Sequence, residues 1–267
     1  MLKDITLGQY YQTESVIHRL DPRVKLAGTV LYIVSLFLFD NIFGYLCAGI
    51  FLALIIRLSN VPFKFMVKGM RSILILLLIT VIFNLFLTPG EVLFTVWKLE
   101  ITKEGLETAI YMGIRLTLLI IGSSVMTLTT TPNNLTDGME KAMSPLKVFK
   151  LPVHEIAMMM SIALRFIPIL MEETDKIMKA QIARGADFES GNLFKKAKAM
   201  VPLLVPLFIS AFRRANDLAM AMEARCYRGG DGRTKMKPLI YKKRDGMAYL
   251  TLVLYLVLSI LVGKILL

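Results

Sequence analysis

Two stretches of this sequence end in an arginine that follows alanines spaced three residues apart. The two motifs are Ile177-x-x-Ala180-x-x-Ala183-Arg184 and Leu218-x-x-Ala221-x-x-Ala224-Arg225. Each arginine is followed by a small residue, Gly185 or Cys226. Residues three apart share one helical face, and small residues on that face let another backbone approach closely. The pattern predicts two helix ends that each present an arginine beside small residues.

The chemistry open to such an arginine is recognition of a carboxylate through two parallel hydrogen bonds. Gly185 is suited to the left-handed conformation that ends many helices. Arg184 then falls in the last helical turn, where the helix dipole favours a cation. Two matched ends predict two equivalent grooves on a dimeric or pseudo-dimeric partner. The alternative is that Arg184 and Arg225 are solvated caps of two surface helices.

Two long amphipathic helices must position these ends. Apolar residues recur at three- and four-residue steps from Ile167 to Ile182 and from Leu204 to Met222, with charged residues on the opposite faces. This period is typical of amphipathic helices rather than membrane spans. Such helices lie along a membrane surface or pack onto partner helices.

The rest of the chain has the composition of an integral membrane protein. It is 55% hydrophobic with a mean hydropathy of +0.61, whereas a soluble domain is about 45–50% apolar. A bilayer needs about 20 apolar residues per helix, and Arg23 and Lys25 can lengthen a short first span by snorkelling. We predict about five spans, at Leu26–Phe39, Ile42–Ile56, Ser72–Thr88, Leu106–Thr131 and Met247–Val262. Val201–Phe212 is apolar enough to enter the bilayer edge as well.

The charges predict how these spans are oriented. The segment from Arg57 to Arg71 contains basic residues and no acid, which places it in the cytoplasm by the positive-inside rule. The N-terminus is then cytoplasmic, and the mixed-charge loop Thr88–Glu104 is extracellular. The net charge of +12 is concentrated between apolar runs, so it indicates cytoplasmic loops of a multi-pass cell-membrane protein and not a nucleic-acid-binding surface.

These features predict an all-α, polytopic membrane protein in three parts. Residues 1–131 form an N-terminal membrane domain with four spans. Residues 132–244 form a cytoplasmic coupling domain that contains the amphipathic helices, and residues 245–267 form a C-terminal span.

One charged residue lies inside an apolar run. Arg115 falls near the middle of the fourth span, where insertion costs at least about 2.5–3.5 kcal/mol, so it should face protein or water. It could contact another subunit or line a substrate path. The alternative is a structural pair with Asn84 or Glu107.

Neither an enzyme nor a cofactor site is indicated. There is no Gly-x-x-x-x-Gly-Lys-Ser/Thr phosphate loop, and the two histidines, His18 and His154, belong to no catalytic constellation. Cys47 and Cys226 lie far apart in the sequence and suggest neither a disulfide framework nor a metal site. If ATP and Mg²⁺ drive this protein, they bind to another chain.

The motifs together resemble a known family. His18-Arg19-Leu20-Asp21-Pro22-Arg23, Arg165-Phe166-Ile167-Pro168 and Arg213-Arg214-Ala215 with the Ala-Arg endings are similar to the signatures of the transmembrane T component of energy-coupling factor transporters, the cobalt-transport permease family. The resemblance covers essentially the whole chain, and the two Ala-Arg motifs are its most specific part.

The resemblance implies a coupling role. A T component assembles with two cytoplasmic ATP-binding subunits and one or more substrate-binding membrane proteins, the S components. It implies that Ala183, Arg184 and Gly185 dock one ATPase and that Ala224, Arg225 and Cys226 dock the other. The second motif departs from the family pattern, with Cys226 in place of glycine. ATP-driven closing of the ATPases would move the helix ends together and deliver a vitamin held by the S component.

Three other functions stay open at this stage. The T component of a dedicated cobalt or nickel importer is the nearest, although the opening Gly8-Gln9-Tyr10-Tyr11 looks more like the shared, vitamin-type version. A self-contained secondary transporter would need intramembrane polar residues, for which Arg115 and Asn84 are the candidates. A membrane scaffold would recruit a soluble partner without dependence on the paired arginines.

Overall fold

A computed structural model describes residues 10–38, 41–96, 99–186, 188, 192–230, 236 and 238–265. Gly8 and Gln9, and Phe39 at the predicted end of the first span, lie outside these residues. The chain forms two compact units. The membrane unit comprises Gly8–Ala142 and Leu239–Leu267, and the coupling unit comprises Met1–Leu7 and Met143–Pro238.

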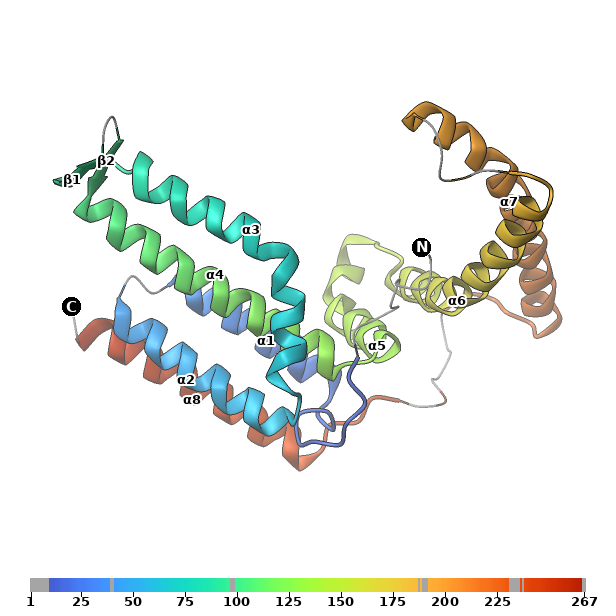
Figure 1. The fold of residues 1–267 in the computed structure, drawn as a ribbon. Coiled ribbons are helices and arrows are strands. Elements are labelled where there is room, and N and C mark those ends of the chain that lie inside the picture. The colour runs from blue at the N-terminus through green and yellow to red at the C-terminus, as the bar shows by residue number, and fades with distance from the viewer. Residues whose placement is uncertain are drawn as a thin grey trace. The chain divides into compact units, whose positions relative to one another are not determined.

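The membrane unit is built mainly from long helices. Figure 1 shows α3 lying along α4 and α2 lying beside α8. Its helices are α1 (Pro22–Phe37), α2 (Ile42–Ser59), α3 (Phe63–Leu87), α4 (Lys103–Thr129), α5 (Pro132–Ala142) and α8 (Lys243–Ile265). Two strands, β1 (Val92–Val96) and β2 (Leu99–Thr102), pair antiparallel between α3 and α4. The sequence predicted only a loop there, so this short hairpin is a local difference within a mostly helical fold.

Local chemistry fixes the helix boundaries. The Asp21 carboxylate accepts the Arg23 backbone N–H before α1, with Pro22 in the first turn, an arrangement that suits a helix start. Thr102 caps α4 by accepting the Gly105 N–H at 3.0 Å. The predicted division between the first two spans is confirmed, because α1 ends at Phe37 and α2 begins at Ile42.

The core of the membrane unit lies where α1, α2, α4 and α8 meet. Ser35 and Tyr255 share a buried hydrogen bond between their hydroxyls at 2.8 Å, and Phe51 stacks on Tyr255 with ring centroids 4.2 Å apart. A Cβ at Gly122 would lie 2.6 Å from the Tyr32 ring, so glycine lets α1 and α4 approach closely. Helices far apart in the sequence are therefore packed into one bundle.

The outer face of this bundle is apolar and exposed, with Ile75 67%, Leu76 63% and Leu46 61% accessible. Such a surface fits lipid rather than water. Among the residues that the structure describes, four helical stretches can cross a membrane by length and composition: Ile42–Ser59, Lys103–Thr129, Val153–Ala183 and Lys243–Val262. Ile73–Leu87 is a shorter apolar stretch. The prediction of a polytopic helical membrane protein is confirmed.

The described part of the coupling unit contains the 3₁₀ helix η2 (Ser144–Phe149) and the α-helices α6 (Val153–Ala183) and α7 (Leu193–Ala224). α6 was expected to be amphipathic, yet its N-terminal half is apolar enough to count among the four membrane-length helices. Pro168 lies inside α6, and Pro202 and Pro206 lie inside α7. The stretch Val201–Phe212, which the sequence allowed at the bilayer edge, is an internal part of α7.

Candidate docking site

The end of α6 carries the first arginine motif. α6 ends at Ala183, and Arg184 follows as the C-cap with φ −89° and ψ 7°. Gly185 adopts a left-handed φ of 87°. The Gly185 N–H donates to the Ile182 carbonyl, and the Ala186 N–H donates to the Gln181 carbonyl, both at 2.9 Å. This pair of bonds is the Schellman motif, which satisfies the last carbonyls of a helix.

The end of α7 repeats this geometry. Arg225 is the C-cap with φ −93° and ψ 13°, and Cys226 adopts a left-handed φ of 56°. The Cys226 N–H donates to the Glu223 carbonyl at 2.8 Å, and the Tyr227 N–H donates to the Met222 carbonyl at 3.0 Å. The sequence repeat therefore corresponds to a structural repeat, despite the substitution of cysteine for glycine.

Both helix ends are open to a partner. Ala183, Arg184 and Gly185 are exposed, and so are Ala224, Arg225 and Cys226. Neither arginine forms an ion pair with any residue that the structure describes. A cation at a helix C-terminus is favoured by the dipole, and an unpaired guanidinium can donate to an incoming carboxylate.

Contacts between α6 and α7 fix how far apart the two ends lie. Glu173 accepts hydrogen bonds from Ser210 and from Arg214, the latter at 2.9 Å, and Gln181 donates to the Pro202 carbonyl at 3.4 Å. Residues further along α6 contact residues earlier in α7, so the two helices cross antiparallel (Figure 1). The end of α6 lies near Pro202, and Arg225 lies roughly 35 Å further along α7 at the helical rise of about 1.5 Å per residue.

Arg115, the intramembrane candidate, is held by aromatic residues. Its Nε donates to the Tyr45 hydroxyl at 2.8 Å, and its guanidinium lies over Phe37 with the ring centroid 5.5 Å away. The Asn84 amide donates to the Thr80 carbonyl of its own helix at 2.8 Å. The sequence offered Asn84 or Glu107 as the partner of Arg115 and did not anticipate Tyr45, because tyrosine within an apolar run gives no signal of such a pairing.

No site for a metal ion is found among the described residues, since they contain no group of three His, Cys, Asp or Glu side chains that could hold one. The sequence analysis placed Glu173 on the charged face of its helix but did not predict its contacts with α7. The signal available was that Ser210 and Arg214 lie one helical turn apart on α7, which lets both reach one carboxylate.

A bundle of apolar helices, with two matched and exposed arginine caps on the chain, defines a multi-pass membrane protein. Comparison with known proteins narrows this class. A profile of the cobalt transport protein family, CbiQ, matches residues 13–236. The energy-coupling factor transporter transmembrane protein EcfT of Clostridium kluyveri is 56% identical over 264 residues, which cover 98% of this chain and 97% of that protein.

Two further relatives with the same description agree. EcfT of Bacillus subtilis is 47% identical over 254 residues, 95% of this chain and 96% of the relative. EcfT of Lactococcus lactis is 44% identical over 265 residues, 99% and 100% of the two chains. The chain belongs to the EcfT family of energy-coupling factor transporter transmembrane proteins, within the cobalt transport protein family. It is a non-catalytic transporter subunit, as the resemblance in its motifs implied.

Proposed function

We propose that this chain is the coupling subunit of an importer, transmitting the motion of two cytoplasmic ATP-binding subunits to a substrate-binding membrane protein. The observation that carries the proposal is the matched geometry of the two helix ends. Arg184 and Arg225 occupy the same C-cap position of the same hydrogen-bonded motif and are both exposed. Two helix ends of the same geometry on one chain fit two identical or homologous grooves, one on each ATP-binding subunit.

The distance between the ends supports two partners rather than one groove. The ends are roughly 35 Å apart along α7 at the helical rise, which exceeds the width of a single helix of about 10–12 Å. Each arginine would meet a carboxylate in its own ATP-binding subunit. ATP and Mg²⁺ bind to those subunits in this proposal, and this chain binds no cofactor. A vitamin bound by the S component is the cargo.

The proposal places the N-terminus and the coupling unit in the cytoplasm. Lys25 at the start of α1 donates to the Thr129 carbonyl at the end of α4 at 2.8 Å. The Asp21 N–H donates to Asp245 at the start of α8 at 2.9 Å. These three helix ends therefore share one side of the membrane unit. The basic segment Arg57–Arg71 contains the end of α2, the turn that follows it and the start of α3, which begins at Phe63 and not at the predicted Ser72. Alternating spans put this segment on that side, which the positive-inside rule makes cytoplasmic.

Affinity purification in mild detergent tests the proposal. The unaltered chain should retain two ATP-binding subunits and at least one small membrane protein, and the Arg184→Ala/Arg225→Ala variant should lose the ATP-binding subunits. Lys179→Ala/Arg213→Ala is the matched control, because it removes one exposed cation from each of the same helices. Equal recovery of the ATP-binding subunits with both double variants would refute the docking role.

A second cargo is favoured by one observation, the description of the matching family as cobalt transport proteins. Uptake by cells that express the complex separates the two cargoes. Accumulation of radiolabelled vitamins without ⁵⁷Co²⁺ or ⁶³Ni²⁺ supports the vitamin importer. Accumulation of either metal ion, and of no vitamin, would assign the chain to a metal importer instead.

A further inference from the structure

The start of α1 holds the two points at which the chain leaves and re-enters the membrane unit. The coupling unit, residues 143–238, carries both docking arginines and is joined to the membrane unit through Ala142 and Leu239. Asp21 and Arg23 bind the returning chain, in which Asp245 is the acceptor for Asp21, and Pro22 and Lys25 contact the departing chain. We call these five residues the α1 clamp.

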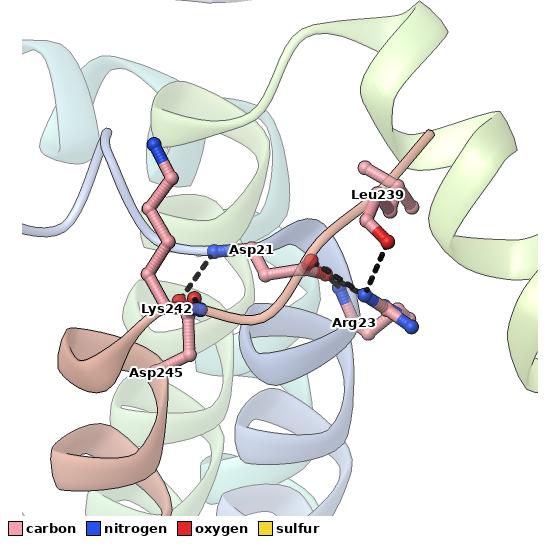
Figure 2. Close-up of polar contacts among 5 residues, drawn as sticks. All are labelled: Asp21, Arg23, Leu239, Lys242 and Asp245. Carbon is pink, nitrogen blue, oxygen red and sulfur yellow. Dashed lines mark hydrogen bonds and ion pairs between the residues drawn. The ribbon is translucent and has the colours of Figure 1, made fainter. Parts of the chain in front are cut away.

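The returning chain is fixed by hydrogen bonds at three places (Figure 2). The Arg23 Nη2 donates to the Leu239 carbonyl at 3.2 Å. The Asp21 N–H donates to Asp245 Oδ1 at 2.9 Å, and the Lys242 N–H donates to Asp245 Oδ2 at 2.7 Å. One carboxylate thus ties the start of α8 to the residue that caps α1.

Arg23 is itself held rigidly. Its guanidinium donates to Asp21 through Nε at 3.0 Å and Nη2 at 2.8 Å, a bidentate pair of fixed geometry. The Arg23 and Asp21 side chains are 17% and 4% exposed. The guanidinium also lies over the Tyr241 ring, 3.7 Å from its centroid. The largely buried Arg23 side chain therefore contacts the returning chain at both Leu239 and Tyr241.

The departing chain meets the same helical turn. Lys25 Nζ donates to the Thr129 carbonyl, the last residue of α4, at 2.8 Å, and to the His18 carbonyl at 3.1 Å. Pro22 packs against Gly138 of α5, where an added Cβ would lie 3.2 Å from the Pro22 Cβ. The chain segments next to both covalent connections of the coupling unit therefore contact the start of α1.

We propose that Asp21, Arg23 and Asp245 are positioning residues that make the membrane helices follow the coupling unit. This inference rests on the proposed coupling function. Force applied at Arg184 and Arg225 reaches the membrane unit through Ala142 and Leu239. If the chain at Leu239 were loose, α7 could move while α8 and α1 stayed in place. ATP would then be hydrolysed without moving substrate.

The test uses the whole complex, in vesicles, with ATP hydrolysis and uptake of a mixture of radiolabelled water-soluble vitamins measured together. Asp245→Asn keeps the shape of a side chain that is 1% exposed but replaces one of its two acceptors with a donor. Arg23→Gln removes the charge and the bidentate grip, and Arg23→Lys restores the charge. Arg19→Ala is the control, because the ion pair of Arg19 with Glu14 is exposed.

The expected result is retention of the ATP-binding subunits and of hydrolysis, with vitamin delivered per ATP lowered by about tenfold, the scale of ordinary coupling energies. Arg23→Lys should recover part of the loss, and Arg19→Ala should change nothing. A residue with only a structural role would lower hydrolysis, uptake and subunit recovery together, and that result would overturn the proposal.

A milder variant keeps the test decisive if the substitutions in the clamp prevent accumulation of the protein. Tyr241 is 50% exposed, so Tyr241→Leu removes the ring under Arg23 and its contact with Tyr249 but leaves the hydrogen bonds of Asp21, Arg23 and Asp245. It should lower the vitamin-to-ATP ratio to a smaller extent. An unchanged ratio in an assembled complex refutes the clamp. Failure of the unaltered chain to bind ATP-binding subunits would instead refute the proposed function.

Discussion

Cys226 occupies, at the end of α7, the left-handed backbone position that Gly185 occupies at the end of α6. Their φ angles are 56° and 87°, and both residues donate the same bond of a Schellman motif. An L-residue in this conformation costs about 1–2 kcal/mol relative to the right-handed one. The end of α7 therefore has the same geometry as the end of α6, but Cys226 adds a backbone strain energy that Gly185 does not.

Substitutions at these two positions should have opposite effects on stability. Gly185→Ala should destabilise the protein by about 1 kcal/mol, from backbone strain alone, because an added Cβ meets no atom within 4 Å. Cys226→Gly should stabilise it by up to about 1 kcal/mol, since relief of strain exceeds the added chain entropy. Thermal unfolding in detergent measures both, and a lower melting temperature for Cys226→Gly would contradict the strain argument.

The Arg115–Tyr45 hydrogen bond should contribute to the stability of the membrane unit. Tyr45→Phe removes the hydroxyl that accepts from Arg115 Nε while it leaves the ring stacked on Tyr111. A hydrogen bond to a charged group is worth about 1.5–3 kcal/mol, so a clear fall in melting temperature is expected. Tyr111→Phe is the control with the same chemical change. Equal effects of the two substitutions would rule out a special role for the Arg115 pair.

Periodicity and motif spacing predicted much of the fold and the two helix ends that carry Arg184 and Arg225. Apolar runs located α2, α3, α4 and α8, because membrane helices must bury long apolar stretches. The repeated Ala-Arg endings located Arg184 and Arg225, because a helix C-terminus is a local structure whose signals lie within a few residues. These features depend on neighbours in the sequence and can therefore be read from it.

Pairings between distant segments could not be predicted in the same way. The contact of Asp21 with Asp245 and that of Arg23 with Leu239 join residues more than 200 positions apart. Asp-Pro before a helix predicted a cap, which Asp21 provides, but nothing local identifies Asp245 as its partner. The β1–β2 hairpin was also missed, because its charged residues resemble those of a loop.

Acidification should weaken the N-terminal segment that precedes α1. Burial lowers the pKa of His18 below its ordinary value of 6.5. The neutral ring donates from Nε2 to the Tyr11 carbonyl at 3.1 Å and accepts at Nδ1 from Ser15 at 2.7 Å. The unfolded chain takes up a proton at higher pH than the folded one, so stability falls as pH drops through the unfolded pKa.

The measurement is the melting temperature at about pH 7.5 and about pH 5.5, on either side of the unperturbed histidine pKa. The unaltered protein should lose more stability on acidification than His18→Gln, which cannot titrate at this position. An identical loss in the two proteins would show that other groups cause the pH dependence.

Labelling from outside the cell tests the proposed orientation. In a background with Cys47→Ser and Cys226→Gly, Lys64→Cys lies in the first turn of α3, within the basic segment Arg57–Arg71, and should react with an impermeant maleimide only after permeabilisation. Glu91→Cys, before β1, should react in intact cells, because alternating spans place the hairpin opposite the basic segment. Reaction of Lys64→Cys in intact cells would reverse the orientation.

The central claim is that each of the two arginines docks one ATP-binding subunit. Native mass spectrometry of the purified complex counts those subunits directly. The unaltered chain should carry two, Arg184→Ala and Arg225→Ala should each give species with one, and the double variant should carry none. Retention of two subunits by the double variant, with the protein intact in the membrane, would contradict the account.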